Sequence, residues 1–377
     1  MIKIDGSFLE GGGQIIRTSL ALSALTGKAF TISGIRKGRS KPGLRPQHLN
    51  AVRAVRQLCN AEVSGDAPDS QALVFTPKKT ESANLSVDIG TAGSVTLLMQ
   101  SLLIPAVFGG KNIVISLKGG TDVRWSQPYD YFRNILLKYI EPFAGVESEL
   151  IRRGYYPKGG GEIKVTLKPK FSLTSYENFS EHLNEVRSQL PEMNLCCQGE
   201  LKAIEGVSHA SEKLKGVPER QARQARKVLE KLQCPVSIKT EYSQSRCPGS
   251  GITLRAVFSE ASWPVLLGGD SLGERGKRAE KVGEEAALRL MKQIESGAAV
   301  DKYLADQLLP LAVFLPSARY KASEITPHCR TNIYVIEKFL PVTFSADDNI
   351  VNLRRVPEKN IPAFSVRSSA FRRCHTA

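Results

Sequence analysis

Hydrophobic residues near the N-terminus follow a helical period that begins directly after a run of glycines. In GGGQIIRTSLALSALTGKAFTISGI, the glycine turn precedes an amphipathic pattern over about 14–25, a second glycine and a strand-like segment. The segment GTAGSVTLLMQSLLIPAVFGGKNIVISL repeats this order over 90–117. A third, less regular copy starts with EIKVTL after residue 159 and resumes, after an interruption, at 300–316. This similarity predicts one supersecondary unit, a sheet with two helices, used several times around a shared core.

The interruption has a different composition, which predicts an inserted domain. Between about 172 and 280 the chain is rich in Lys, Glu, Gln and Ser, and its pattern reads strand, charged helix, strand, strand. We therefore expect a large domain of residues 1–180 plus 281–345 and a compact α/β insert of residues 181–280. The remaining residues, 346–377, are expected to form a partly mobile basic C-terminal tail.

Composition places the chain among ordinary globular proteins. A chain of 377 residues with 41% hydrophobic and 24% charged residues is too long for one ordinary core. The apolar run at 97–108 is interrupted by Gln100, Ser101 and Pro105 and is too short to cross a bilayer. The N-terminus lacks the pattern of a secretory signal, so we expect a cytoplasmic protein, or a nuclear one in a eukaryote. Seven cysteines without a CxxC pair favour reduced thiols over disulfides or structural zinc.

Net charge favours a polyanionic partner. The chain has 52 Lys and Arg against 37 Asp and Glu, a net charge of +15 and a pI near 9.5. Nucleic acid is the leading candidate, although a merely basic surface explains charge alone equally well. The segment RKGRSKPGLRPQHLNAVRAVR at 36–56 sharpens the prediction, because its Arg-rich loop precedes a helix from about His48. Guanidinium groups and free backbone amides there could hold several phosphates.

The EGGGQ segment at 10–14 is a candidate binding site for a phosphate and a divalent cation. Glu10 precedes glycines and a helix start, where backbone amides can approach phosphate and the carboxylate can hold a cation. Arg17 lies one helical turn farther and can face the same anion. A tight turn with a solvated Glu is the competing interpretation. The chain contains neither GxxxxGK[ST] nor a strand-coupled GxGxxG, which argues against an ordinary P-loop or dinucleotide enzyme.

Other polar or aromatic positions allow two interpretations each. The segment at 119–132 contains Tyr129 and Tyr131, which suit base stacking, although core packing is the stronger interpretation. Asp306 lies in an otherwise apolar helical pattern, so it needs a ligand, a helix cap or an interhelical hydrogen bond. The loop RRGYYPKGGGE is explained as well by a hairpin turn as by phosphate binding. A lone histidine such as His328 is more often structural than catalytic, and its functional interpretation depends on Glu10.

Together these segments resemble the RNA 3′-terminal phosphate cyclases. The motifs EGGGQIIR, GRSKPGLRPQHL, GTAGSVTLLMQ, LKGGTD, YPKGGGE, YLADQLLPLA and HCRTNIYVIEKFLPV occur here in the family order. The resemblance implies an α+β fold whose large domain has three repeated units, each a four-stranded sheet with two helices. Each unit would be similar to the C-terminal domain of translation initiation factor three. A smaller α/β domain is expected before the last repeat.

The resemblance also implies a reaction. A histidine attacks the α-phosphorus of ATP, AMP passes to the 3′-phosphate of an RNA, and the neighbouring 2′-hydroxyl closes a 2′,3′-cyclic phosphate. His328 matches the nucleophile, and Glu10 matches the residue that holds Mg²⁺ or Mn²⁺. The positions that match contacts to the phosphates or the RNA end are Arg17, Arg36, Arg39 and Gln47. The positions that match the ATP site are Gln100, Pro128, Tyr303, Leu304, Ala305, Asp306 and Gln307, with Tyr303 and Pro128 expected to sandwich the adenine.

Two other functions remain open from the sequence. A non-catalytic branch of the same fold acts as an RNA-binding scaffold in ribosomal RNA processing, but it lacks the catalytic histidine that His328 matches here. Enolpyruvyl-type transferases use related repeats without a covalent nucleotide. Cys329 and Arg330 follow His328 where the cyclases often have aliphatic residues. Expected partners are ATP and RNA with a 3′-phosphate end, without a membrane, and the sequence leaves the oligomeric state open.

Overall fold

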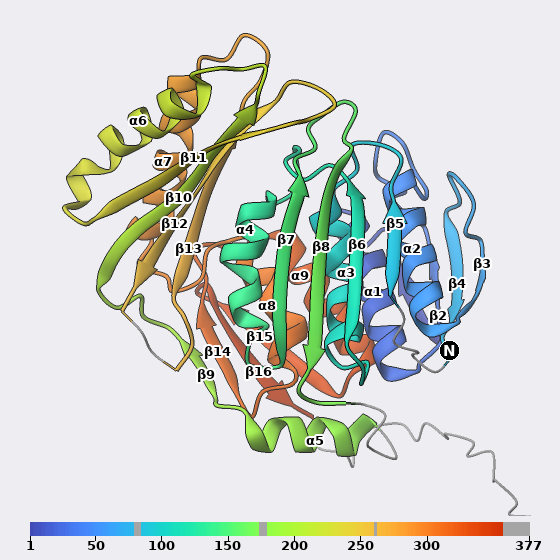
Figure 1. Cartoon of the computed structure of the whole chain (residues 1–377). Coiled ribbons are helices and arrows are strands. Elements are labelled where there is room, and N and C mark those ends of the chain that lie inside the picture. Colours follow the sequence, from blue (N-terminus) through green and yellow to red (C-terminus); the bar gives the residue numbers. More distant parts are fainter. Residues whose placement is uncertain (79–83, 173–178, 260–261, 357–377) are drawn as a thin grey trace, which may run out of the picture.

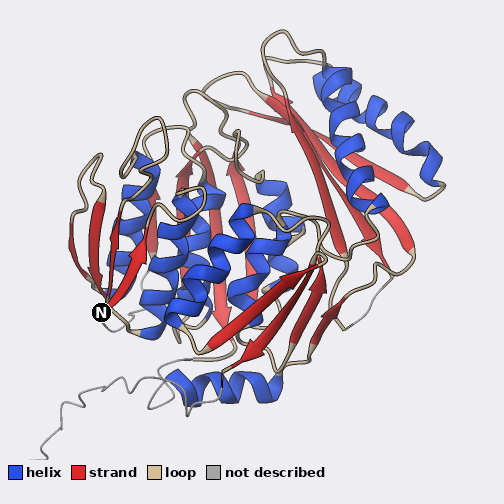
Figure 2. Ribbon diagram, turned by 180° about the vertical axis from the view of Figure 1, so that it is seen from behind, coloured by secondary structure: helices blue, strands red, loops and turns tan. Residues whose placement is uncertain are grey.

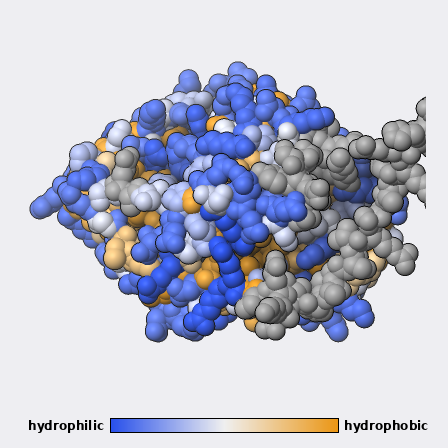
Figure 3. Space-filling model, turned by 90° about the horizontal axis from the view of Figure 1, so that it is seen from below, coloured by the Kyte–Doolittle hydropathy of each residue, from blue (hydrophilic) through white to orange (hydrophobic). Residues whose placement is uncertain are grey.

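The protein has an α+β fold, as the sequence predicts. The structure is a computed structural model, which describes residues 1–78, 84–172, 179–259 and 262–356 (Figure 1). In this part of the chain the strands form four sheets of four strands each. None of the helices within these ranges is both long and apolar enough to span a membrane. The face seen in Figure 3 is largely hydrophilic, with hydrophobic residues in small patches.

Three of the sheets repeat one topology, which confirms the predicted repeated unit. In each unit, strand, helix, strand, helix, strand, strand follow one another, and the sheet order is first, second, fourth, third. The first two strands are parallel and the other neighbours antiparallel. The first unit consists of β1 (Ile2–Asp5), α1 (Gly13–Thr26), β2 (Phe30–Ser33), α2 (Pro46–Cys59), β3 (Glu62–Ser64) and β4 (Ala72–Thr76).

The second unit follows directly, and the third begins before the insert and ends after it. The second consists of β5 (Leu85–Asp88), α3 (Val95–Val107), β6 (Ile113–Gly119), α4 (Tyr129–Asn134) with the 3₁₀ turn η1 (Leu136–Tyr139), β7 (Ala144–Arg152) and β8 (Gly161–Pro169). The third consists of β9 (Met193–Leu195), α8 (Leu304–Ala312), β14 (Ala318–Lys321), α9 (Pro327–Phe339), β15 (Val342–Asp347) and β16 (Ile350–Arg355).

The assignment of EIKVTL to the third repeat was wrong. These residues lie in β8, which pairs with β6 and β7 and completes the second sheet. The loop RRGYYPKGGGE connects the antiparallel strands β7 and β8, so its interpretation as a hairpin turn is confirmed. A sequence repeat fixes the type of a strand but not the neighbours with which it pairs, and pairing decides the unit.

The fourth sheet belongs to the insert. Its elements are β10 (Leu201–Ser211), α6 (Val217–Leu229), η3 (Glu230–Leu232), β11 (Val236–Ser243), β12 (Ser250–Phe258), β13 (Leu266–Leu272) and α7 (Ala279–Glu295), with strand order β11-β10-β12-β13. Helices α6 and α7 pack against each other and against this sheet. In Figure 1 the insert stands apart from the three repeated sheets.

The insert begins at β10 and ends with α7, so both its ends lie later in the chain than the predicted bounds of 181 and 280. Strand β9 pairs with β14 in the third sheet, and α5 (Phe179–Gln189) contacts the large domain through His182, whose ring lies 5.3 Å from that of Phe108. Helix α7 packs on β13 and extends the insert's elements to residue 295. Part of the predicted tail is also structured, because β16 pairs with β14 and β15. The rest of it, 357–377, lies outside the described residues.

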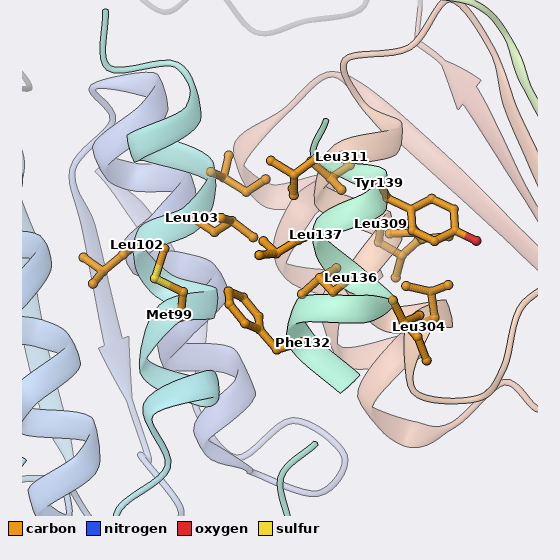
Figure 4. Close-up of a cluster of buried hydrophobic side chains, with 14 of the residues drawn as sticks. Met99, Leu102, Leu103, Phe132, Leu136, Leu137, Tyr139, Leu304, Leu309 and Leu311 are labelled. Atoms are coloured by element: carbon orange, nitrogen blue, oxygen red, sulfur yellow. The ribbon is translucent and has the colours of Figure 1, made fainter. Parts of the chain in front are cut away.

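The helices of the three units pack together between their sheets. Figure 2 shows them grouped in the middle of the large domain. Helix α1 contacts α2, α3 and α9, so its residues from Gln14 to Leu25 are buried rather than amphipathic as predicted. Figure 4 shows how the units share one core: Met99 and Leu103 of α3 face Phe132 of α4 and Leu137 of η1, and Leu304 and Leu309 of α8 lie on the other side of η1. This shared core places the starts of α1, α8 and α9 near one another.

A buried ionic cluster joins the insert to the second sheet. The Arg153 guanidinium lies 2.8 Å from Asp130, 3.3 Å from Asp122 and 3.1 Å from Glu241 of the insert. His209 of the insert lies 3.2 Å from Asp122. Burial opposes ionisation of Asp122, but His209 and Arg153 hold its pKa below the ordinary value. Although Asp122, Asp130 and His209 are close enough to hold a metal ion, Arg153 already supplies the compensating cation.

We expect Arg153→Met to destabilise the protein by about 3–5 kcal/mol, because it leaves buried carboxylates without their cation. The measurement is urea unfolding followed by circular dichroism. The matched control is Lys168→Met, which removes an exposed partner of Glu147 and should change the free energy of unfolding little. An Arg153→Met variant as stable as the parent would contradict this role for the cluster.

Candidate active site

A cleft of about 630 Å³ lies between the large domain and the insert. One wall contains residues of α1, α3 and the loop before α4, and the starts of α8 and α9 contribute to it. The opposite wall contains β13, the loop after it and α7 of the insert. Five of the predicted site residues, which are far apart in sequence, line this cleft: Arg17, Gln100, Tyr303, Asp306 and His328.

His328 lies in the first turn of α9. The helix begins with Pro327, and the hydroxyl of Thr326 accepts a hydrogen bond from the Cys329 amide at 3.3 Å. The imidazole is half-exposed at the cleft, and its Nε2 lies 3.6 Å from Oε2 of Glu10. A helix N-terminus carries a partial positive charge, which favours the neutral form of an imidazole placed there.

One turn along α9, Asn332 holds this helix against α1 and α8. Its Oδ1 accepts hydrogen bonds from Gln14 Nε2 at 2.9 Å and from Thr18 Oγ1 at 2.6 Å. Its Nδ2 donates to the carbonyl oxygen of Asp306 at 2.9 Å. All four residues are buried, so these hydrogen bonds are protected from competition with water. The network fixes the turn of α9 that carries His328.

Glu10 lies between Arg39 and His328. Its carboxylate accepts a hydrogen bond from Arg39 Nη2 at 3.2 Å, and its carbonyl oxygen accepts one from Arg39 Nε at 3.1 Å. The glycines after Glu10 permit this approach. A Cβ atom at Gly13 would lie 2.2 Å from Nε2 of the buried His48, a distance that no side chain could accept. The glycine run therefore lets the loop reach both α2 and the start of α9.

Arg17 and Asp306 place opposite charges deep in the cleft. Arg17 Nε donates to Gln100 Oε1 at 3.2 Å, and its Nη2 donates to Gln14 Oε1. Burial lowers the pKa of Arg17 to about 10, with Asp306 opposing, so the guanidinium stays charged at neutral pH. Burial raises the pKa of Asp306 to about 7, with Arg17 opposing. The cleft therefore contains a fixed cation and a carboxyl group that titrates near neutrality.

The surroundings of His328 favour its neutral imidazole. Its partial burial lowers the pKa below the ordinary value, Glu10 opposes this shift, and the cations Arg17 and Arg39 add to it. A neutral imidazole has a free electron pair on one nitrogen, which is the form that acts as a nucleophile. The geometry can therefore support attack by His328 on an electrophile held in the cleft.

Three other predicted phosphate or adenine contacts, Arg36, Gln47 and Pro128, are not among the residues that line the cleft. Arg36 is half-buried in the turn after β2, and burial and the nearby Arg39 lower its pKa. Gln47 Oε1 accepts a hydrogen bond from the Ser94 amide at 3.3 Å at the start of α3. Pro128 is buried at the N-terminus of α4.

Three predicted residues of α8 have contacts within the protein. Leu304 and Ala305 are fully buried, so their side chains belong to the core. Gln307 Nε2 donates to the carbonyl oxygen of Tyr303 at 2.9 Å and contacts Gln127 Oε1 at 3.4 Å. Any contact of Leu304 or Ala305 with a ligand would therefore involve their backbone.

Comparison with known proteins agrees with this arrangement. A family model described as RNA 3'-terminal phosphate cyclase matches residues 8–346. The chain belongs to this family. The cyclase of Pyrococcus abyssi is 45% identical over 353 residues, which are 93% of this chain and 96% of that protein. The cyclase of Sulfurisphaera tokodaii is 46% identical over 91% of this chain and 95% of that protein. The cyclase of Archaeoglobus fulgidus is 42% identical over 94% of this chain and 100% of that protein.

Several cleft residues of this cyclase family member were not predicted as site residues. The insert contributes the basic residues Lys277 and Arg289, and the insert had matched the family only in outline. Lys302 places its ammonium group 5.0 Å from the centre of the Tyr303 ring. Trp125 also lines the cleft, within the segment whose Tyr129 and Tyr131 are fully buried, as the core-packing interpretation required.

Replacing Glu10 with Gln should lower the pKa of His328 further, because it removes the carboxylate that favours the imidazolium while Arg17 and Arg39 remain. The measurement is a histidine NMR titration, with the His328 signal assigned from a His328→Asn variant. An unchanged or raised pKa in Glu10→Gln would contradict the proximity of the two side chains.

Proposed function

We propose that this protein is an ATP-dependent enzyme that converts the 3′-phosphate of an RNA to a 2′,3′-cyclic phosphate through a histidine-AMP intermediate. The observation that carries the proposal is the position of His328, 3.6 Å from Glu10 at a cleft that buried Arg17 also lines. The names of the relatives support the overall reaction. We further expect the protein to act in the cytoplasm.

In the first step, the unprotonated nitrogen of His328 attacks the α-phosphorus of ATP. A phosphorus–nitrogen bond forms, the bond to the oxygen bridging to the β-phosphate breaks, and pyrophosphate leaves. Arg17 is a buried cation in the lining of the cleft, and Arg39 pairs with Glu10, which lies beside His328. Such preorganised cations stabilise the negative charge that develops on transferred and departing phosphates.

Glu10 fits the role of a ligand for Mg²⁺ or Mn²⁺. Its carboxylate is 34% exposed and faces the Arg39 guanidinium and the His328 imidazole. A single carboxylate suffices for Mg²⁺ when substrate phosphates supply further oxygens. When bound, the cation would neutralise charge on the leaving pyrophosphate. In its absence Arg39 balances the Glu10 charge.

Tyr303 is the adenine partner that the cleft makes most accessible. Its ring is half-buried, lies 6.3 Å from the Tyr131 ring in an edge-to-face arrangement and lines the cleft with Gln100. Pro128, the second expected adenine partner, is buried. We therefore propose that Tyr303 supplies the main stacking face for ATP and that Pro128 sets the shape of the pocket.

The remaining steps transfer AMP to RNA and close the ring. An oxygen of the RNA 3′-phosphate attacks the phosphorus of the histidine-AMP, the phosphorus–nitrogen bond breaks, and the imidazole is regenerated. The 2′-hydroxyl then attacks the activated 3′-phosphorus, loses its proton and displaces AMP. The non-catalytic scaffold and the enolpyruvyl-type transferase have less support, because neither requires a nucleophilic histidine beside Glu10.

His328→Asn should abolish adenylylation and cyclisation while RNA binding stays nearly unchanged, because only the nucleophile is lost. The protein is incubated with ATP labelled at the α-phosphate and Mg²⁺ or Mn²⁺, and then chased with a 3′-phosphorylated RNA oligonucleotide. In the parent protein, acid-labile label should form and disappear on the chase as the RNA end becomes cyclic. Cyclisation by the His328→Asn variant would overturn the mechanism.

Glu10→Ala should raise the metal concentration needed for half-maximal adenylylation, because the cation then depends on the triphosphate alone. The rate is measured against Mn²⁺ concentration in both proteins, and Lys37→Ala, an exposed residue of the neighbouring loop, serves as the control. The same metal dependence in Glu10→Ala and the parent would remove Glu10 as the ligand.

A further inference from the structure

Trp125 has an unfavourable position for a large apolar side chain, because it is exposed to solvent and its backbone is left-handed. Its side chain is 92% exposed, and its backbone has the left-handed φ of 62° that disfavours bulky residues. The other tryptophan, Trp263, is 2% exposed and donates a hydrogen bond to the Glu192 carbonyl oxygen at 3.0 Å. An exposed, conformationally strained residue at a cleft is typical of a binding position.

The loop that carries Trp125 is held in place on both sides. Thr96 Oγ1 donates to the Gln127 carbonyl oxygen at 2.8 Å, and Ser126 Oγ donates to the Val123 carbonyl oxygen at 3.0 Å. Arg124 forms an ion pair with Glu274 of the insert. The loop thus connects the large domain to the insert across the cleft, and Trp125 is presented from a fixed backbone.

The surroundings of Trp125 suit a nucleic acid strand. Five Lys and Arg residues line the same cleft against three carboxylates. Two of the five cations already have carboxylate partners, because Arg124 pairs with Glu274 and Lys277 pairs with Glu285 outside the lining. The other cations are Arg17, Arg289 and Lys302, against Asp270 and Asp306. Single-stranded RNA is bound by combining such cations, which attract the backbone, with aromatic rings on which unstacked bases lie.

We propose that Trp125 is a positioning residue that stacks on a nucleobase of the RNA near its 3′-phosphate and so aligns that phosphate with the adenylylated His328. The inference rests on the proposed function and adds a substrate contact that the motifs did not indicate. Tyr303, half-buried and beneath the Lys302 ammonium, suits the enclosed base of a mononucleotide. Trp125, almost fully exposed, suits a strand that enters from solvent.

The test separates the two half-reactions. Trp125→Ala should leave adenylylation by ATP unchanged and raise the KM for a short 3′-phosphorylated oligoribonucleotide by about tenfold or more, since one base stack contributes that order of binding. Trp125→Phe should restore most of the loss because it keeps an aromatic face. Tyr156→Ala, which removes another exposed aromatic outside the cleft lining, should match the parent.

Intrinsic fluorescence gives a readout that does not depend on catalysis. The oligoribonucleotide should quench the exposed Trp125 in the parent, and quenching should vanish in Trp125→Phe, where only the buried Trp263 remains. An oligoribonucleotide whose two 3′-terminal nucleotides lack bases should bind the parent and Trp125→Ala equally, because the stack is then absent from both.

Three outcomes would overturn the proposal. The first is an unchanged KM for RNA in Trp125→Ala. The second is a raised KM for ATP in that variant, which would assign Trp125 to the binding of ATP. The third is that RNA does not quench the tryptophan fluorescence of the parent. Failure of the proposed function gives a different result. If RNA quenches the fluorescence but the parent is not adenylylated, the stacking contact stands and the proposed reaction is contradicted. If the parent is adenylylated but RNA does not quench, the proposed reaction stands and the stacking contact is contradicted.

Discussion

The buried amide of Asn332 is the contact on which the geometry of the site depends. Its hydrogen bonds to Gln14, Thr18 and the Asp306 backbone join helices from the first and third units. A second contact also joins the first unit to α9. The Phe8 ring stacks on the Tyr334 ring, with 4.2 Å between the ring centres, and the Tyr334 hydroxyl accepts a hydrogen bond from the Asp5 amide. Together they place Glu10 beside His328, although 318 positions separate Asn332 from its partner Gln14. Removal of one partner from such a network costs about 1–3 kcal/mol, because the remaining polar groups stay buried.

The insert forms one wall of the cleft. Without β13 and α7 the cleft would lose one wall, together with Lys277 and Arg289. The buried cluster around Arg153 fixes this wall at the second sheet, and the Arg124–Glu274 pair connects its rim to the loop of Trp125. The three repeated units therefore supply the wall that contains His328 and Arg17, and the insert supplies the opposite wall.

The sequence predicts local elements and chemistry better than pairing and boundaries. The helix after the glycine run and the helix beginning near His48 follow from periodicity and Gly and Pro signals, and both are present as α1 and α2. The assignment of EIKVTL to the third unit was wrong, because strand pairing depends on contacts that a period does not encode. Charge and glycines indicated a site near Glu10, but the role of Asn332 depends on packing between distant helices. Trp125 was overlooked because its exposure and backbone conformation appear only in the structure.

We propose above that His328 is the nucleophile that accepts AMP from ATP. The most direct measurement is peptide mapping by mass spectrometry after brief incubation of the unmodified protein with ATP and a divalent cation, with digestion kept alkaline to protect a phosphoramidate. The account predicts a single AMP adduct on the peptide that contains His328, and its loss after mild acid or addition of 3′-phosphorylated RNA. An acid-stable adduct on a lysine, or cyclisation of RNA without any adduct at His328, would contradict it.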